Sequence, residues 1–183
     1  MLKRLRGRKA VRESAGALYG AVVEQARTPA FYRDADVPDT LDGRFELIAL
    51  HAFMVLRRLQ ADPERTGVLA QALFDTMFDD MDRSLRELGA GDLGVGRRVK
   101  FMASSFLGRV KAYEEGLESG DEALRSALVR NLYGTVPAPA DDARAMARYT
   151  RDQLAALEAQ PLDDLVAGSV RFDADVALPA GTG

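Results

Sequence analysis

The chain has 183 residues, 47% of them hydrophobic and 29% charged, which is the composition of an ordinary soluble protein with one main domain. It has no cysteine and a single histidine, His51, which excludes disulfides, iron–sulfur clusters, thiolate nucleophiles and paired-histidine metal sites, and disfavours most enzyme mechanisms. The formal net charge is only -3, but the charges are unevenly distributed.

The first 13 residues are expected to form a basic N-terminal arm. Positive charge that is segregated in this way suggests an anionic surface nearby, either lipid headgroups or RNA phosphates. The arm lacks the apolar segment of a secretory signal, and no apolar run in the chain approaches the roughly 20 residues that span a bilayer. The cations that precede the first acid, Glu13, are Lys3, Arg4, Arg6, Arg8, Lys9 and Arg12.

Hydrophobic spacing predicts an all-α fold, a single compact domain of about six helices over residues 14–172. Residues 31–39 read as an ordered loop, and residues 173–183 as a short irregular, flexible tail. Thr40 or Asp42, Asp62 and Asp121 are suited to cap helix starts. The predicted helices are approximately 14–27, 40–60, 62–88, 95–117, 121–132 and 141–159.

Residues 89–94 spell the glycine pattern of dinucleotide-binding loops. That pattern works when a strand precedes it, so that a helix start can receive a pyrophosphate. Here a long amphipathic helix precedes it. We interpret the segment as a turn between two helices.

The predicted third helix carries acids on one side, and Asp75, Asp79 and Asp82 could in principle hold a divalent ion. Arg83 and Arg86 follow at four-residue spacing, where they form stabilising pairs with Asp79 and Asp82. This pattern is typical of a solvated helix face. A metal-dependent hydrolase remains a minor alternative.

The same helix has an unusually wide apolar arc rich in methionine and phenylalanine. Phe74 and Phe78 lie at the edge of the arc and are candidate contacts with a hydrophobic partner, since methionine and phenylalanine adapt to varied apolar surfaces. Burial in the core explains the same pattern.

The fourth helix is basic, with no acid between Leu93 and Tyr113. Its cations either pair with the acidic third helix or meet an anionic lipid or RNA surface. His51 lies among apolar residues on the central helix, where core packing competes with contact to a client or haem. The basic residues are Arg97, Arg98, Lys100, Arg109 and Lys111.

Several segments, in one order, resemble the ubiquinol-cytochrome c chaperone family, bacterial branch, over roughly Leu18 to Tyr133. The segments that carry the resemblance are Gln25–Arg27, Phe31–Tyr32, Pro38–Glu46, Leu50–Met54, Phe74–Asp82, Leu85–Glu87, Arg97–Met102 and Phe106–Gly116.

The resemblance implies a helical assembly chaperone, not an enzyme, that receives newly made cytochrome b and promotes assembly of the cytochrome bc complex, respiratory complex III. The absence of cysteine fits the reducing cytoplasm, and we expect the protein to be peripheral at the inner face of the bacterial inner membrane, with no cofactor and no metal. Mitochondrial relatives also associate with the ribosome. The alternative function is an RNA, ribosome or membrane-surface adaptor that uses the basic arm and the basic residues from Arg97 to Lys111.

The surface of the third and fourth helices is the predicted client site. The client- or partner-binding residues expected from the motifs and the resemblance together are Arg44, His51, Phe74, Phe78, Asp79, Asp82, Arg98, Lys100, Phe106, Arg109 and Tyr113.

Overall fold

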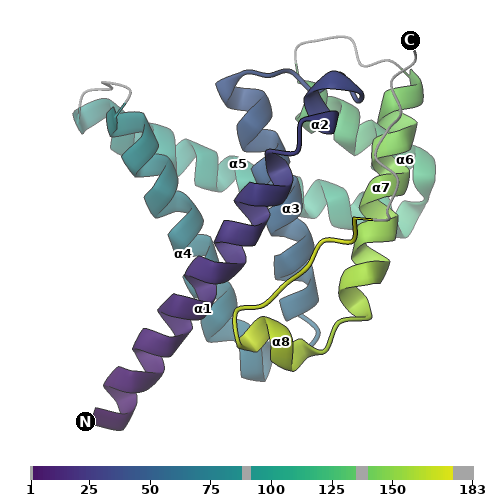
Figure 1. Cartoon of the computed structure of the whole chain (residues 1–183). Coiled ribbons are helices and arrows are strands. Elements are labelled where there is room, and N and C mark those ends of the chain that lie inside the picture. The colour runs from purple at the N-terminus through teal and green to yellow at the C-terminus, as the bar shows by residue number, and fades with distance from the viewer. Residues whose placement is uncertain (1, 88–91, 135–139, 175–183) are drawn as a thin grey trace.

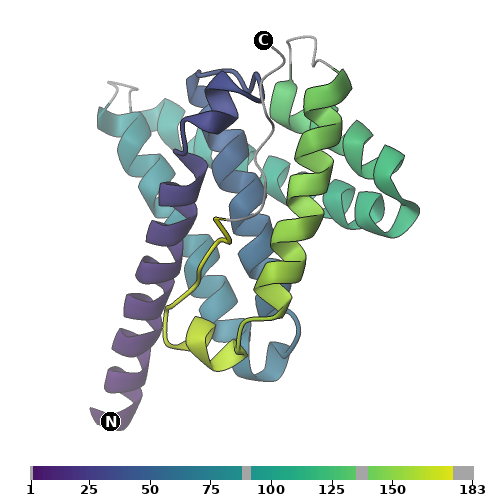
Figure 2. The same ribbon diagram turned by 45° about the vertical axis from the view of Figure 1, so that its right-hand side comes forward.

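Helix α3 (Leu41–Leu59) runs through the centre of the protein, and the other long helices pack around it (Figures 1 and 2). The computed structural model describes residues 2–87, 92–134 and 140–174, and within these ranges all regular secondary structure is helical. The all-α prediction is confirmed. In chain order the other elements are α1 (Leu2–Ala26), α2 (Ala30–Arg33), α4 (Pro63–Glu87), α5 (Asp92–Ser119), α6 (Asp121–Leu128), the π-helical turn η1 (Val129–Tyr133), α7 (Ala140–Glu158) and α8 (Leu162–Val166).

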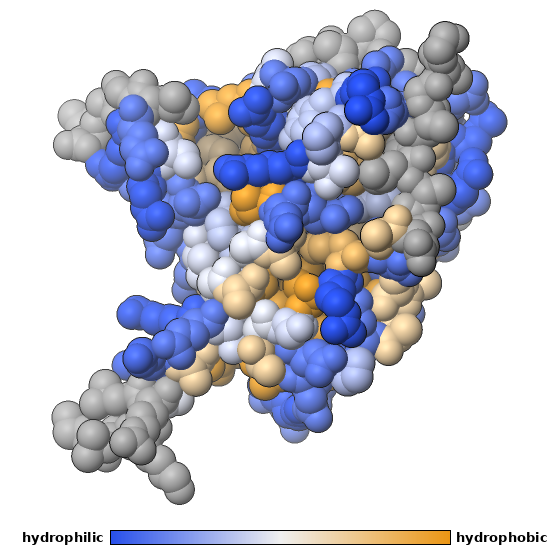
Figure 3. Space-filling view, viewed as in Figure 1, coloured by the Kyte–Doolittle hydropathy of each residue, from blue (hydrophilic) through white to orange (hydrophobic). Residues whose placement is uncertain are grey.

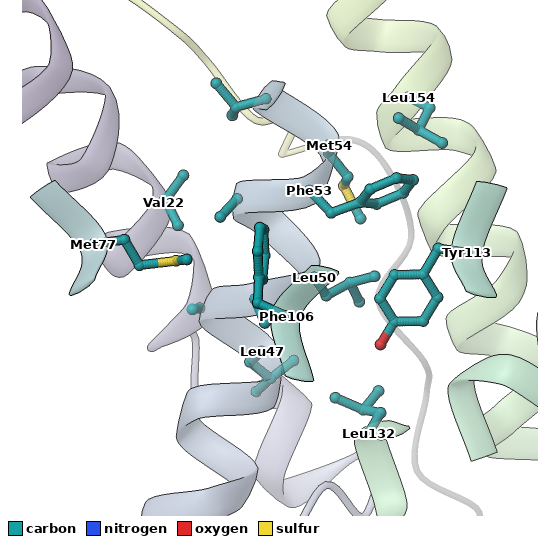
Figure 4. Packing of buried hydrophobic residues seen from close by; sticks show 14 of the residues in the cluster. Val22, Leu47, Leu50, Phe53, Met54, Met77, Phe106, Tyr113, Leu132 and Leu154 are labelled. Carbon is teal, nitrogen blue, oxygen red and sulfur yellow. The ribbon is translucent and has the colours of Figure 1, made fainter. Parts of the chain in front are cut away.

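The central position of α3 follows from apolar side chains on all of its faces. Leu47, Leu50 and Met54 are fully buried, and Ala52 and Val55 are buried on another face of the helix. Each large apolar side chain buried in this way stabilises the fold by roughly 1.5–3 kcal/mol. Figure 4 shows side chains of the surrounding elements converging on α3, among them Val22, Met77, Phe106, Leu132 and Leu154.

Helix α1 is longer than the predicted first helix because it begins at Leu2 and not near Ser14. Its first turns consist largely of leucine, lysine and arginine, which have high helix propensity but here show no apolar periodicity. The basic residues predicted to form an arm are therefore part of the helix. In Figures 1 and 2 this end of α1 points away from the body of the protein.

Two of the three predicted caps are present. The Thr40 hydroxyl accepts a hydrogen bond from the Gly43 amide at 3.1 Å, and the Asp62 carboxylate accepts one from the amide three residues later at 3.3 Å. The Asp121 prediction is wrong, because Asp121 is the first residue of α6. Gly120 precedes it with φ of +108°, a conformation that favours glycine and reverses the chain between α5 and α6.

The remaining differences from the predicted elements are short. Helix α2 occupies part of the expected loop, η1 continues α6, and α8 follows Pro161, so the described residues contain more than six helices. Gly89 and Gly91 of the glycine pattern lie outside the described residues, as does the predicted tail from residue 175 onwards. Within the described ranges, no helix is both long enough and apolar enough to cross a bilayer.

Helices α4 and α5 form a hairpin whose ends near Glu87 and Asp92 project from the body (Figure 1). Helix α1 packs along α4, and α6 packs along α5. Between the two helices of the hairpin, the rings of Phe74 and Phe78 lie 4.7 Å apart and both face Phe106, with centroid distances of 5.9 and 6.1 Å. Aromatic packing therefore joins the two helices of the hairpin.

Candidate functional site

A groove lies between the projecting ends of α4 and α5 and the ends of α1 and α3 that face them. Its volume is about 740 Å³, which is in the range of ligand and peptide sites. Figure 3 shows hydrophobic surface recessed at this place between two hydrophilic regions. We name it the hairpin groove. Its apolar lining comprises Val23, Ala26, Leu41, Phe45, Ile48, Met81, Leu85 and Met102.

Arginines surround the hairpin groove, but their charges are only partly compensated. Arg44 pairs with Asp39 at 2.7 Å, and this hydrogen bond holds the pKa of the Asp39 carboxyl below its usual value. Arg98 lies 3.9 Å from Asp42, at the outer limit of an ion pair. Exposed pairs of this kind are weak, so their guanidinium groups can exchange one carboxylate for another. The arginines that line the groove are Arg27, Arg33, Arg44 and Arg98.

A second recess, of about 480 Å³, opens on the other side of α5. It shares Phe45 and Met102 with the hairpin groove, and Phe101 lies on its edge. Phe101 is 71% exposed and Leu41, in the hairpin groove, is 50% exposed. Leu41 of α3 and Phe101 of α5 are therefore large exposed apolar side chains on the surface of two neighbouring recesses.

Glu46 and Arg109 form an ion pair beneath this surface. The Arg109 Nε donates to one Glu46 oxygen at 2.5 Å and its Nη2 donates to the other, which joins α3 to α5. The guanidinium carbon also lies 5.5 Å from the centroid of the Phe45 ring. Burial raises the pKa of Glu46 against the opposing effect of the arginine. Arg109 is therefore committed to an internal partner.

The predicted aromatic contacts lie in the interior of the hairpin. Phe78 and Phe106 are buried and Phe74 is half-buried, so these rings face one another and not solvent. Tyr113 is fully buried against Phe53, with ring centroids 5.4 Å apart, and burial raises the pKa of its hydroxyl. Contact of these side chains with a client remains a prediction, which in this conformation would require the hairpin to open.

The acidic face of α4 is a solvated surface. Asp79 is exposed, and Asp82 accepts a hydrogen bond from Arg86 at 2.5 Å, as predicted. Arg83 lies 3.8 Å from Asp80, three residues before it on the helix, and is not paired with Asp79 as predicted. Among the described residues, no group of three or more potential ligands could hold a metal ion.

His51 is a core histidine. Its Nδ1 lies 2.7 Å from the Leu47 carbonyl, which can only accept, so Nδ1 carries the proton. Its Nε2 lies 2.8 Å from the Tyr149 hydroxyl and accepts from it, and Gln25 donates to the same hydroxyl at 2.9 Å. Burial lowers the pKa of His51 to about 4, so the ring is neutral at pH 7. Both ring nitrogens are engaged.

Exposed cations lie along the projecting part of α1. Arg8, Lys9 and Arg12 line a recess of about 760 Å³ opposite α4, and Val68 of α4, 72% exposed, lies in the same recess. The side chains of Lys3, Arg4 and Arg6 lie outside the described side chains. Lys100 is exposed on α5, far along the chain from this recess.

The structure brings only part of the predicted site together. Arg44 and Arg98 line the hairpin groove, whereas His51, Phe78 and Asp79 lie in the core, inside the hairpin and on the outer face of α4. Leu41, Phe101, Met81 and Met102 line the groove or the neighbouring recess, which their sequence pattern did not predict. The exposure of Phe101 could have been inferred from the sequence, because polar residues such as Lys100 and Ser104 are its neighbours on α5.

Comparison with known proteins gives a consistent family. Residues 33–172 match the family model described as Ubiquinol-cytochrome C chaperone. The chain is 26% identical over 154 residues to Ubiquinol-cytochrome c reductase complex assembly factor 1 of Drosophila melanogaster, covering 81% of this chain and 60% of the relative. It is 31% identical over 108 residues to Protein CBP3, mitochondrial, of Saccharomyces cerevisiae, covering 57% of this chain and 32% of that protein.

The fold is also that of a solved relative. The crystal structure of the Cbp3 homolog from Brucella abortus matches with a TM-score of 0.82 and 36% sequence identity, covering 96% of this chain and 98% of that chain. The chain spans 60% and 53% of the length of the fly and mouse assembly factors. The family model and this structural match, together with the helical fold described above, show that the chain belongs to the ubiquinol-cytochrome c chaperone family.

Proposed function

We propose that this protein is an assembly chaperone of the cytochrome bc complex, respiratory complex III, that binds newly made cytochrome b. It acts by binding and not by turnover. The names of its relatives, which describe them as assembly factors of the ubiquinol-cytochrome c reductase complex, support the complex as the destination. Cytochrome b is the part of this proposal that comes from the family resemblance alone.

The observation that carries the proposal is the hairpin groove. Its floor is apolar and its edge is cationic, with Leu41 exposed in the groove and Phe101 exposed in the neighbouring recess. Apolar client residues that would otherwise aggregate before insertion gain free energy by covering such a floor, at about 25 cal/mol per Å² removed from water. Acidic residues beside them would meet Arg27, Arg44 and Arg98.

The test is capture of newly synthesised cytochrome b by this protein in bacterial membranes. Leu41→Asp combined with Phe101→Asp places charge on the apolar surface at exposed positions, so the fold is retained. We expect this variant to lose capture. The control is Val166→Asp, an exposed apolar residue on α8 far along the chain from the groove, which keeps capture.

Two results would contradict the proposal. Full capture by the Leu41→Asp, Phe101→Asp variant would exclude the groove as the client site but leave the function intact. No capture by the wild type, together with an intact complex in a strain lacking the protein, would overturn the function itself. Substituting Phe78 would not make this distinction, because Phe78 is buried against Phe106.

A second candidate function is a surface adaptor, and the recess beside α1 favours it. Arg8, Lys9 and Arg12 with the exposed Val68 combine cations and an apolar side chain, the combination that binds anionic lipid headgroups. In this form the protein is peripheral at the inner face of the bacterial inner membrane. RNA or ribosome binding uses the same cations and differs by requiring no apolar contact.

A further inference from the structure

The segment Gly168–Asp173, which we name the strap, crosses the protein between α1 and α7 (Figures 1 and 2, yellow). Gly168 turns the chain out of α8 with φ of +87°, and a Cβ there would lie 2.8 Å from the Ser14 Cα of α1. From Ser169 to Asp173 the strap has no regular secondary structure. Its course is instead set by side chains of α7 and the core.

Two glutamines hold the strap by its backbone. Gln153 of α7 accepts from the Asp173 amide at 3.0 Å and donates to the Asp173 carbonyl at 2.8 Å. Gln160, just after α7, does the same for Arg171, at 3.0 and 2.7 Å. Each side-chain amide therefore satisfies both backbone groups of one residue, as a neighbouring strand would.

The two held residues alternate with residues that point into the core. Val170 is buried, and the ring of Phe172 packs against His51 with centroids 5.1 Å apart. Arg171 and Asp173 are exposed. Backbone groups held at every second residue, with side chains buried at the residues between, is the geometry of an extended peptide bound in a slot.

The floor of the slot is a set of aromatic rings that the rest of the core holds in place. Phe31, His51 and Tyr149 contact one another edge to face, with centroids 5.2 to 5.8 Å apart. Tyr149 and His51 are also joined by a hydrogen bond. None of these contacts among Phe31, His51 and Tyr149 involves Phe172.

We propose that this slot is a binding site for an extended peptide segment with apolar side chains two residues apart, and that the strap fills it in the free protein. The glutamines contact only the backbone, so the slot accepts different sequences, and the buried surroundings of Val170 and the aromatic rings beneath Phe172 select apolar side chains. The strap is exchangeable because, among the described residues, backbone-to-backbone hydrogen bonds end at Ser169. This site is separate from the hairpin groove and does not depend on the identity of the client.

The experiment uses the purified full chain and a fluorescent peptide with the sequence of residues 168–174. Val170→Ser combined with Phe172→Ser weakens the anchors of the strap but leaves the slot intact. We expect the peptide to bind this variant at least about tenfold more tightly than the wild type, in which the strap competes. A peptide with serine at the positions of Val170 and Phe172 does not bind.

Adding Gln153→Ala and Gln160→Ala to that variant removes the backbone contacts and is expected to weaken peptide binding by at least about tenfold. Gln71→Ala, on the exposed surface of α4, is the matched control and leaves binding unchanged. Absence of peptide binding to a variant that circular dichroism shows to be helical and that melts cooperatively would overturn the proposal, as would equal binding of the serine peptide.

Hydrogen exchange on the wild type tests the strap without any substitution. We expect the Arg171 and Asp173 amides to exchange at least about tenfold faster than the amide of Leu50 in α3, because the strap opens locally. Equal exchange rates would mean that the strap leaves the slot only when the whole protein unfolds, and the proposal would fail on that result alone.

Discussion

Arg109 of α5 donates hydrogen bonds to both carboxylate oxygens of Glu46 on α3, and the two side chains are 18% and 9% exposed. This contact connects the projecting hairpin to the central helix. Buried ion pairs of this kind contribute little net stability when compared with an apolar pair, because both charges lose their hydration. Removing only one partner of such a pair lowers the stability of the fold strongly, because the other charge stays buried without its counter-charge.

We expect Arg109→Ala to lower the free energy of unfolding by about 3–5 kcal/mol, because it leaves Glu46 buried without its counter-charge. Urea denaturation followed by circular dichroism measures the loss. Glu46→Leu combined with Arg109→Met removes both charges and should recover most of it. A double variant as unstable as the single one would show that the ion pair stabilises the fold more than an apolar pair at the same positions does.

The neutral, buried His51 makes stability depend on pH. Its pKa is lowered by burial to about 4, below the ordinary value of 6.5, so between these pH values the unfolded chain binds a proton that the folded chain does not. Stability from this group is therefore present above pH 6.5 and is lost as the pH falls towards 4. The loss amounts to about 3 kcal/mol.

The measurement compares the free energy of unfolding of wild type and His51→Gln at several pH values in this window. The difference between the two proteins isolates His51 from the carboxylates that titrate in both. We expect the wild type to lose more stability than the variant as the pH falls. Parallel curves would mean that His51 is protonated within the folded protein without cost.

The fold was largely predictable because its helices are marked by local signals. Thr40 and Asp62 cap helices as expected, and the apolar faces of α3 predict a central position. The candidate site could not be predicted in the same way, because the packing of the helices against one another decides which side chains line it. The apolar arc of α4 is wide, and only the course of α5 decides that Phe78 is covered while Phe101 is left exposed. The ion pair between Glu46 and Arg109 likewise depends on the packing of α5 against α3, which the sequence does not show.

Two aromatic substitutions compare the stability contribution of a buried ring with that of an exposed ring. Phe78→Ala empties a position packed between Phe74 and Phe106, and we expect it to cost about 3–5 kcal/mol of unfolding free energy. Phe101→Ala, at a position 71% exposed, should change stability by less than about 0.5 kcal/mol. Thermal unfolding of the two variants side by side checks the contrast. A destabilised Phe101→Ala protein would place that ring in the core.

Substitution by alanine is expected to change the stability of the fold in opposite directions at two glycines of α5. At Gly116 an added Cβ would lie 2.8 Å from the Leu124 Cα, a backbone atom that cannot move aside, so Gly116→Ala should destabilise the fold by about 1–3 kcal/mol. At Gly108 nothing lies within 4 Å, so Gly108→Ala should stabilise the helix by about 0.5–1 kcal/mol. Denaturation midpoints measure both changes. If Gly116→Ala were neutral, α5 and α6 would be free to separate.

The projecting end of α1 predicts binding to anionic membranes. Arg8→Gln, Lys9→Gln and Arg12→Gln together remove cations that each contribute about 1 kcal/mol near an anionic surface, so affinity for vesicles should fall roughly 100-fold. Sedimentation with vesicles of phosphatidylglycerol and phosphatidylcholine measures it, and vesicles of phosphatidylcholine alone give the background. The matched control, Arg83→Gln, Arg144→Gln and Arg148→Gln, removes equal charge from exposed positions on α4 and α7. If the control loses as much affinity, the interaction follows net charge, and the end of α1 is not a membrane site.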